Sequence, residues 1–181
     1  MERQCFLATT ALEDFWDTTK PILFLGEWCL LYERRSFWEN NKWEMVSSPF
    51  QNTADAHAAY YYVDNVYEHI LVKLAGALNL MHRKSYSLNY WWILIGPWLL
   101  HYLPVIYDRY KYIQKALQEH PRLTTIVLSE TSFVIPVDTY DFAIKLSDDL
   151  FNLQIYSKVF MFFDKRFPSK EKQTENPCKN R

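Results

Sequence analysis

The sequence is poor in glycine and cysteine and has almost no net charge, and each shortage excludes a class of function. Three glycines in 181 residues exclude a glycine-rich phosphate loop of the dinucleotide-binding or Walker type. A net charge of −1 gives no electrostatic basis for binding nucleic acid. Cys5, Cys29 and Cys178 have no paired spacing and follow no secretory signal, so we expect reduced thiols and a cytoplasmic protein.

Metal-binding signatures are also missing from the sequence. His57, His69 and His82 have no recognised ligand spacing, and neither an H-E-x-x-H motif nor a paired C-x-x-C motif occurs. We therefore expect no bound metal and no cofactor.

Aromatic residues, in contrast, are abundant. They make up 18% of the chain, and Tyr and Trp exceed what an aliphatic core requires. Because these side chains combine a large apolar body with a polar group, the excess suits a domain or partner interface as well as a core.

The longest apolar stretch is residues 87–117, which hold three of the seven tryptophans. Pro97 suits the first turn of a helix, so we expect a short helix, a corner at Gly96, and a second helix kinked at Pro104. A membrane span is the alternative, since about 20 apolar residues would suffice. Asn89, His101, the two prolines and the glycine argue against it, and we expect a buried helix pair without a transmembrane span.

Continuous apolar runs at residues 22–25 and 124–128 predict two buried strands, which we expect to be adjacent and parallel. A shorter run at residues 5–9 is a third strand candidate. Long helical patterns separate these runs, including one that begins near Ala54 and another capped by Asp138. We therefore predict a helix-rich α/β fold with a small, partly parallel sheet in residues 1–166, followed by a polar, disordered tail in residues 167–181.

Two carboxylates directly follow the predicted strands. Glu27, after Gly26, follows the first apolar run, and Glu130 follows the second. In open α/β sheets ligands bind at the carboxyl ends of the strands, so these side chains could face one crevice and act on a hydroxyl as a base or hydrogen-bond acceptor. Alternatively, each carboxylate caps a nearby helix or pairs with a surface cation.

Three further residues are weaker site candidates. Arg34 and Arg35 could clamp a phosphate or carboxylate, although a solvated turn is the simpler explanation for them. His101 could act as a general base, or it could be a hydrogen-bonded core histidine.

Four blocks carry a family resemblance: FLATTALEDFWDTTKPILFLGEWC, YYYVDNVYEHIL, YWWILIGPWLLHYLPVIYDRY and LSETSFVIPVDTYDF. Together they resemble the opening part of transferases named from leptospiral O-antigen loci and found in other bacterial surface-polysaccharide clusters. The resemblance covers roughly residues 4 to 168. Members of this family are longer and are similar to two-domain glycosyltransferases of the GT-B type.

The resemblance implies that this chain is the Rossmann-like, N-terminal half of such an enzyme. That half contacts a sugar or lipid-linked acceptor, and a C-terminal half, outside this chain, binds the nucleotide-sugar donor. We therefore expect the chain alone to be inactive, with Glu27, Glu130 and His101 as catalytic candidates and Gly26, Arg34 and Arg35 as substrate-binding candidates. The expected location is the cytoplasm or the inner face of the membrane. A non-catalytic interaction domain that docks through its aromatic surface is the alternative.

Overall fold

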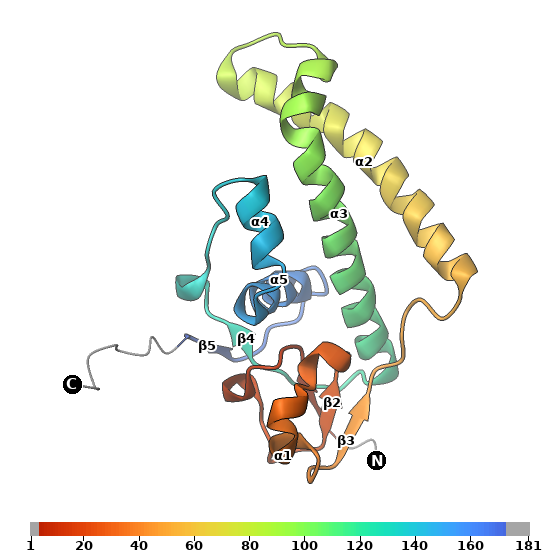
Figure 1. Ribbon diagram of the computed structural model, residues 1–181, viewed down its shortest axis with the longest axis vertical. Helices are drawn as coiled ribbons and strands as arrows, with labels where there is room; N and C mark the ends of the chain where they lie inside the picture. Colours follow the sequence, from red (N-terminus) through yellow and green to blue (C-terminus); the bar gives the residue numbers. More distant parts are fainter. Residues whose placement is uncertain (1–3, 173–181) are drawn as a thin grey trace, which may run out of the picture.

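Short parallel strands lie in the buried core of the molecule. In the computed structural model, which describes residues 4–172, strands β1 (Phe6–Ala8), β2 (Ile22–Phe24) and β3 (Trp43–Met45) form a parallel sheet with β2 in the middle (Figure 1). Strands β4 (Val127–Leu128) and β5 (Ser169–Lys170) form a second parallel pair. The predicted helix-rich α/β class is thus confirmed.

Thr124 joins the two sheets. It lies just before β4 and forms a parallel bridge with Phe6 of β1. The Leu7 amide donates to the Thr124 carbonyl at 2.7 Å, and the Thr124 amide donates to the Cys5 carbonyl at 3.0 Å. The lateral order across both sheets is therefore β3-β2-β1-β4-β5. The prediction that residues 22–25 and 124–128 are neighbours is wrong, because β1 lies between them.

Each face of the sheet packs against different parts of the chain. On one face Leu7, Leu23 and Leu25 pack into the largest core with Ile113 and Phe160 of the helices. Side chains of alternate strand residues point to the opposite face, as the two-residue period requires.

The opposite face is covered by short connections rather than long helices. There Phe6, Ile22 and Phe24 pack against Trp16 and Cys29. Both Cys5 and Cys29 are buried free thiols, in agreement with the expectation of reduced thiols. Cys178 lies outside the described residues.

The helices fill most of the remaining chain, and the single-turn 3-10 helices form the short connections. The α-helices are α1 (Arg35–Trp38), α2 (Thr53–His82), α3 (Leu88–Glu119), α4 (Thr139–Lys145) and α5 (Asp149–Met161). The 3-10 helices are η1 (Glu13–Phe15), η2 (Glu27–Cys29), η3 (Tyr32–Arg34) and η4 (Glu130–Ser132).

Asparagine and aspartate side chains cap helices α2, α4 and α5, and Ser87 caps α3. The Asp138 carboxylate accepts the Asp141 amide at 2.7 Å and caps α4, as predicted. Asn52 caps α2 and Asp148 caps α5, each by accepting the amide three residues later.

Helix α3 runs unbroken through both prolines, contrary to the predicted corner at Gly96. Pro97 and Pro104 cannot donate to the carbonyls of Ile93 and Leu100, four residues earlier. Both of those residues are exposed, so water can satisfy the carbonyls. Gly96 instead permits close helix packing, because a Cβ there would lie 2.9 Å from the Tyr67 hydroxyl of α2.

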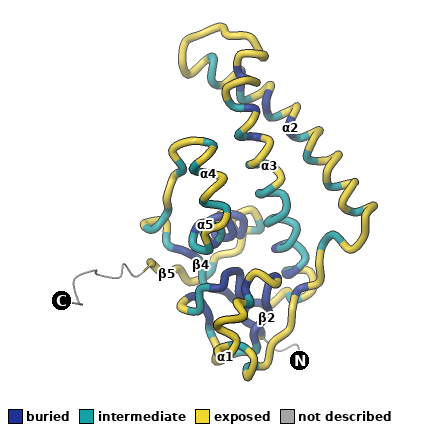
Figure 2. The backbone as a smooth tube through the Cα atoms, in the orientation of Figure 1, coloured by how far each residue is buried: buried dark blue, intermediate teal, exposed yellow. Residues whose placement is uncertain are grey.

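Helices α2 and α3 form an antiparallel hairpin whose far end projects from the rest of the molecule (Figure 1). Figure 2 shows that this end is largely exposed. The prediction that residues 91–107 are mostly buried is therefore wrong, since Trp92, Ile93, Leu94 and Leu100 face solvent. Among residues 4–172 no helix is long and apolar enough to cross a membrane.

The structure extends into the predicted disordered tail. Ser169 and Lys170 form β5, and the Ser129 amide donates to the Lys170 carbonyl at 2.9 Å. The tail prediction is wrong for these residues because β4 offers them an unpaired edge. Residues 173–181 lie outside the described part of the chain.

Candidate functional site

The carboxyl ends of β1, β2 and β4 lie at one edge of the sheet, because all three strands are parallel. Gly26 and Glu27 follow β2, and Ser129 and Glu130 follow β4. The intervening strand β1 separates the two segments by about two strand spacings, roughly 10 Å. Glu27 and Glu130 thus lie at the same edge without being neighbours.

Trp28 forms an aromatic wall at this edge. Its indole N–H donates to the Thr9 carbonyl at 3.4 Å. The ring lies parallel to Tyr156 at 6.5 Å and edge-on to Tyr112 at 5.0 Å. A Cβ on Gly26 would come within 2.1 Å of the indole, so glycine provides the space that the ring occupies.

Beside this wall lies a half-buried polar cluster from α3 and α5. Arg109 donates to the Asp108 carboxylate at 2.8 Å and to the Asn152 amide oxygen at 2.9 Å. Burial raises the pKa of the Asp108 carboxyl, while the Arg109 charge opposes that rise. Burial likewise raises the pKa of Tyr156 and of Asp149.

Sequence reasoning missed this cluster. No sequence signal connects Arg109 with Asn152, which is 43 positions away. The Arg109 Nε atom is buried and has no hydrogen-bond partner within residues 4–172. Sequence reasoning also missed the aromatic wall formed by Trp28, because this wall depends on packing against Tyr112 and Tyr156, which lie far away in the sequence.

The two predicted carboxylates have different surroundings. Among residues 4–172 no hydrogen bond or ion pair engages the Glu27 carboxylate, which is exposed. The Glu130 side chain is 72% exposed and pairs with Lys158 of α5 at 3.1 Å. Lys158 also lies 4.8 Å from the Phe133 ring centroid, which holds the ammonium group near the chain that follows β4.

Lys158 lines an apolar cavity of about 540 Å³ between α3, α4, α5 and the loop that follows η4, which we call the α3–α5 groove. Trp98 and Tyr102 of α3 stack at 4.6 Å along one side. Phe151 and Ile155 of α5 line the opposite side. The walls of the groove are thus mainly apolar. Its polar lining residues are Asp138, Thr139, Gln154 and Lys158, and Lys158 is itself paired to Glu130.

The structure places the other predicted site residues elsewhere. His101 is exposed on α3 and lines neither the α3–α5 groove nor the carboxyl edge. Arg34 forms a two-point ion pair with Glu13, with an Nε–Oε1 distance of 2.9 Å. Arg35 pairs with Glu39 at 3.1 Å. The two arginines therefore bind carboxylates of the chain itself, and their substrate-binding role stays a prediction.

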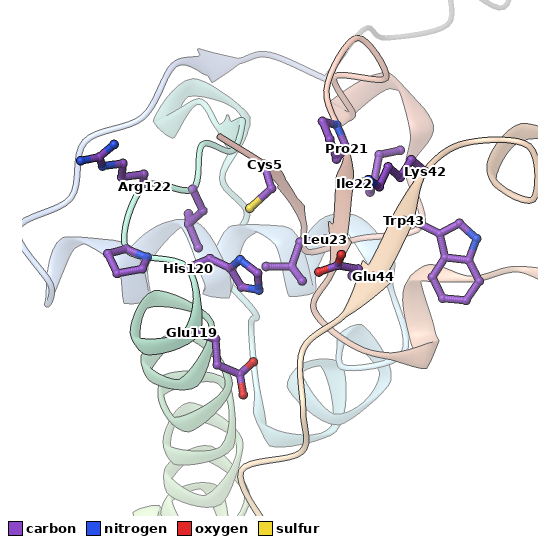
Figure 3. Close-up of a pocket in the computed structure, with 12 residues that line it drawn as sticks. Cys5, Pro21, Ile22, Leu23, Lys42, Trp43, Glu44, Glu119, His120 and Arg122 are labelled. Carbon is purple, nitrogen blue, oxygen red and sulfur yellow. The ribbon is translucent and has the colours of Figure 1, made fainter. Parts of the chain in front are cut away.

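A second cavity, of about 300 Å³, lies at the amino edge of the sheet. Figure 3 shows Glu44 of β3, and Glu119 and His120 from the end of α3, among its lining side chains. The Glu119 carboxylate accepts hydrogen bonds from Ser47, and these lower the carboxyl pKa against the opposing effect of burial. Ligands of parallel α/β sheets bind at the carboxyl edge, so the candidate site is the carboxyl edge rather than this cavity.

No group of three or more His, Cys, Asp or Glu side chains within residues 4–172 is arranged to hold a metal ion. The side chains at and near the carboxyl edge include carboxylates, an arginine, a lysine and stacked aromatic rings.

The helix-rich α/β fold and this carboxyl edge are consistent with an enzyme that transfers a group to an acceptor. A family model described as the LIC12162 family transferase matches residues 5–181, and the chain belongs to this family. The match includes the polar segment after residue 168, where we expected no resemblance. Comparisons with curated proteins and with solved structures find no match.

Proposed function

We propose that the chain is the acceptor-side domain of a glycosyl-type transferase that builds bacterial surface polysaccharide of the O-antigen kind. Membership in a transferase family supports the reaction class. The strand order β3-β2-β1-β4-β5 supports a Rossmann-like domain, because it is the order of the doubly wound dinucleotide-binding fold. In the GT-B arrangement a second domain holds the nucleotide-sugar and closes over the carboxyl edge.

The proposed acceptor is a sugar carried on a lipid, at the inner face of the membrane. The observation that carries this proposal is the α3–α5 groove, whose apolar walls suit a hydrocarbon chain. Lys158 at this groove offers a cation to a phosphate that links lipid and sugar. The acceptor sugar would then lie between Glu130, which Lys158 contacts, and Glu27, with its reacting hydroxyl facing Glu27.

The proposed chemistry is an attack by an acceptor hydroxyl on the anomeric carbon of the nucleotide-sugar. A carboxylate takes the hydroxyl proton, the new glycosidic bond forms, and the bond to the nucleoside diphosphate breaks. Glu27 is the better candidate for this base, since its carboxylate is free of partners within residues 4–172. Glu130 is paired to Lys158 and suits binding of the acceptor.

The proposal is tested with a family member that carries both domains. Radiolabelled nucleotide-sugars are incubated with lipid-linked acceptor extracted from the host, and transfer is measured for the wild type and for Glu27→Gln and Glu130→Gln. Loss of a general base should lower turnover by about 10²–10⁴-fold. Glu68→Gln, an exposed change on α2 away from the sheet, is the matched control. Full activity in both site variants would overturn the assignment.

The alternative is a non-catalytic interaction domain. It is favoured by one observation, the exposed Tyr60, Tyr61 and Tyr62 on α2. Deleting the gene and examining the surface polysaccharide separates the two functions. A transferase predicts loss of polysaccharide that wild type restores and Glu27→Gln does not, whereas an interaction domain predicts equal restoration by both.

A further inference from the structure

The far end of the α2–α3 hairpin, residues 80–94, combines exposed apolar side chains with exposed cations. We call this segment the hairpin tip. Leu80 is 81% exposed, Met81 68% and Ile93 61%. Leu88, Tyr90, Trp92 and Leu94 are also exposed large side chains of the tip. Figure 2 shows that these residues lie on the part of the molecule farthest from the buried core.

The charges around the hairpin tip are of one sign. Residues 69–107 contain no aspartate or glutamate, but they include Lys73, Arg83 and Lys84, all exposed. The whole chain has a net charge of −1, so residues 69–107 form a local region of excess positive charge at the outer part of the hairpin. A partner for this surface must therefore be both apolar and anionic.

The hairpin tip is also rigid enough to present these groups together. Asn79 exchanges hydrogen bonds with the Tyr86 backbone at 2.9 and 3.0 Å and accepts the Trp91 indole N–H at 2.9 Å. Arg83 adopts a left-handed conformation that ends α2, and the Lys84 amide donates a hydrogen bond to the Asn79 carbonyl. Little conformational freedom is left to lose on binding.

We propose that the hairpin tip is a docking element for an anionic lipid bilayer. Leu80, Met81 and Ile93 enter the boundary between headgroups and acyl chains, and Arg83 and Lys84 contact lipid phosphates. Tyr and Trp suit this interface because their rings are apolar with a polar end. The hairpin lies on the surface and does not span it, in line with the absence of a spanning helix among the described residues.

A second copy of the chain is a poorer partner for the same surface. A symmetric pair joined through the hairpin tips would bring Arg83 and Lys84 of both copies together. No carboxylate within residues 69–107 is available to neutralise them. Like charges at such an interface repel, whereas anionic headgroups attract both cations.

This inference extends beyond the proposed function, since bilayer docking requires neither donor nor acceptor sugar. It is tested by sedimenting the 181-residue chain with phosphatidylcholine vesicles, with and without phosphatidylglycerol. We expect the chain to pellet with the anionic vesicles and to be released by salt. Failure of sugar transfer would leave this result unchanged, so the two proposals fail separately.

Two sets of variants test the two kinds of contact. Lys73→Gln/Arg83→Gln/Lys84→Gln should weaken anionic-vesicle binding on the order of 100-fold at low salt, since each cation near such a surface contributes about fivefold. Leu80→Ser/Met81→Ser/Ile93→Ser should weaken it by about tenfold or more, through lost apolar burial. All six side chains are exposed, so thermal melts should confirm that the fold is intact.

The matched control removes three cations from another region. Lys165→Gln/Arg166→Gln/Lys172→Gln should leave vesicle binding within about twofold of wild type, because charges beyond a screening length from the bilayer contribute little. The proposal is overturned if the wild type does not pellet with anionic vesicles, or if the control loses as much binding as the tip variants. It is also overturned if the tip variants abolish self-association in sedimentation velocity but leave vesicle binding unchanged.

Discussion

The Trp28 indole lies parallel to the Tyr156 ring, with 6.5 Å between the ring centroids and 6° between the planes. This pair joins the end of β2 to α5 and covers the carboxyl edge of the sheet. The arrangement depends on Gly26, where a Cβ would overlap the indole.

Replacing Gly26 with alanine should therefore displace Trp28. The stacked aromatic neighbours restrict the indole, so we expect Gly26→Ala to destabilise the fold by about 1–3 kcal/mol, as overpacking does. Urea unfolding measures the loss, and near-ultraviolet circular dichroism reports the tryptophan environment. Gly76→Ala is the matched control, because nothing lies within 4 Å of a Cβ there and alanine favours helix by about 1 kcal/mol. Equal stability of the two variants would show that the position of the Trp28 indole does not require a glycine at position 26.

Burial of Cys29 should make the fold sensitive to alkali. Burial raises the pKa of the Cys29 thiol from 9.0 to about 12. Between these values the unfolded state loses the thiol proton while the folded state keeps it, so stability falls as pH rises from 9.0 to about 12, by up to about 1.4 kcal/mol per pH unit. The measurement is urea unfolding at several pH values. Cys29→Ala should flatten the slope even though it lowers stability at pH 7, and identical slopes would contradict the assignment.

Arg109 should be needed to keep Asp108 ionised inside the fold. Arg109→Met removes two charged hydrogen bonds, and we expect a loss of about 1–3 kcal/mol at pH 7. Because burial already raises the pKa of Asp108, loss of the arginine should raise it further. The variant should therefore become less stable as pH rises above 3.8, the ordinary carboxyl value.

The double variant Asp108→Asn/Arg109→Met is the control for this interaction. It removes the unpaired carboxylate and should recover part of the stability, with a weaker dependence on pH. A loss in Arg109→Met that is the same at every pH would mean that packing of the arginine side chain, rather than its charge, is responsible.

Trp98 and Phe160 should differ in their contribution to stability. Phe160 is 2% exposed within the main core, and Phe160→Ala should cost about 3–5 kcal/mol. Trp98 is half-buried and lines the open α3–α5 groove, so Trp98→Ala should cost less, about 1–2 kcal/mol. Urea unfolding of both variants is the measurement. Equal losses would indicate that the groove is closed around Trp98 in solution.

The sequence contained the local features of the fold. Residues 6–8 and 22–24 form strands that are buried throughout, as their apolar runs predict, and Asp138 caps α4 as predicted. Strand β3 was missed because it has only three residues, Trp43 to Met45, which are too few to show the alternation that marks a half-buried strand. The break predicted at Pro97 was wrong because exposed carbonyls tolerate the missing donor.

The site was only partly predictable. The expectation that Glu27 and Glu130 follow strands at one edge needed no more than parallel strands, and the structure places both there. Their catalytic roles stay predictions. His101 lies away from that edge, which its position in the sequence could not reveal.

By itself the sequence determined the buried strands β1 and β2 and the cap of α4, because apolar runs and caps act over a few residues. Only the tertiary structure decided that β1 separates β2 from β4, and that Arg109 meets Asn152. It also decided that the hairpin tip stays exposed while equally apolar residues of β1 and β2 are buried. These outcomes depend on contacts between residues that are far apart in the sequence. Such contacts form only when the whole chain packs.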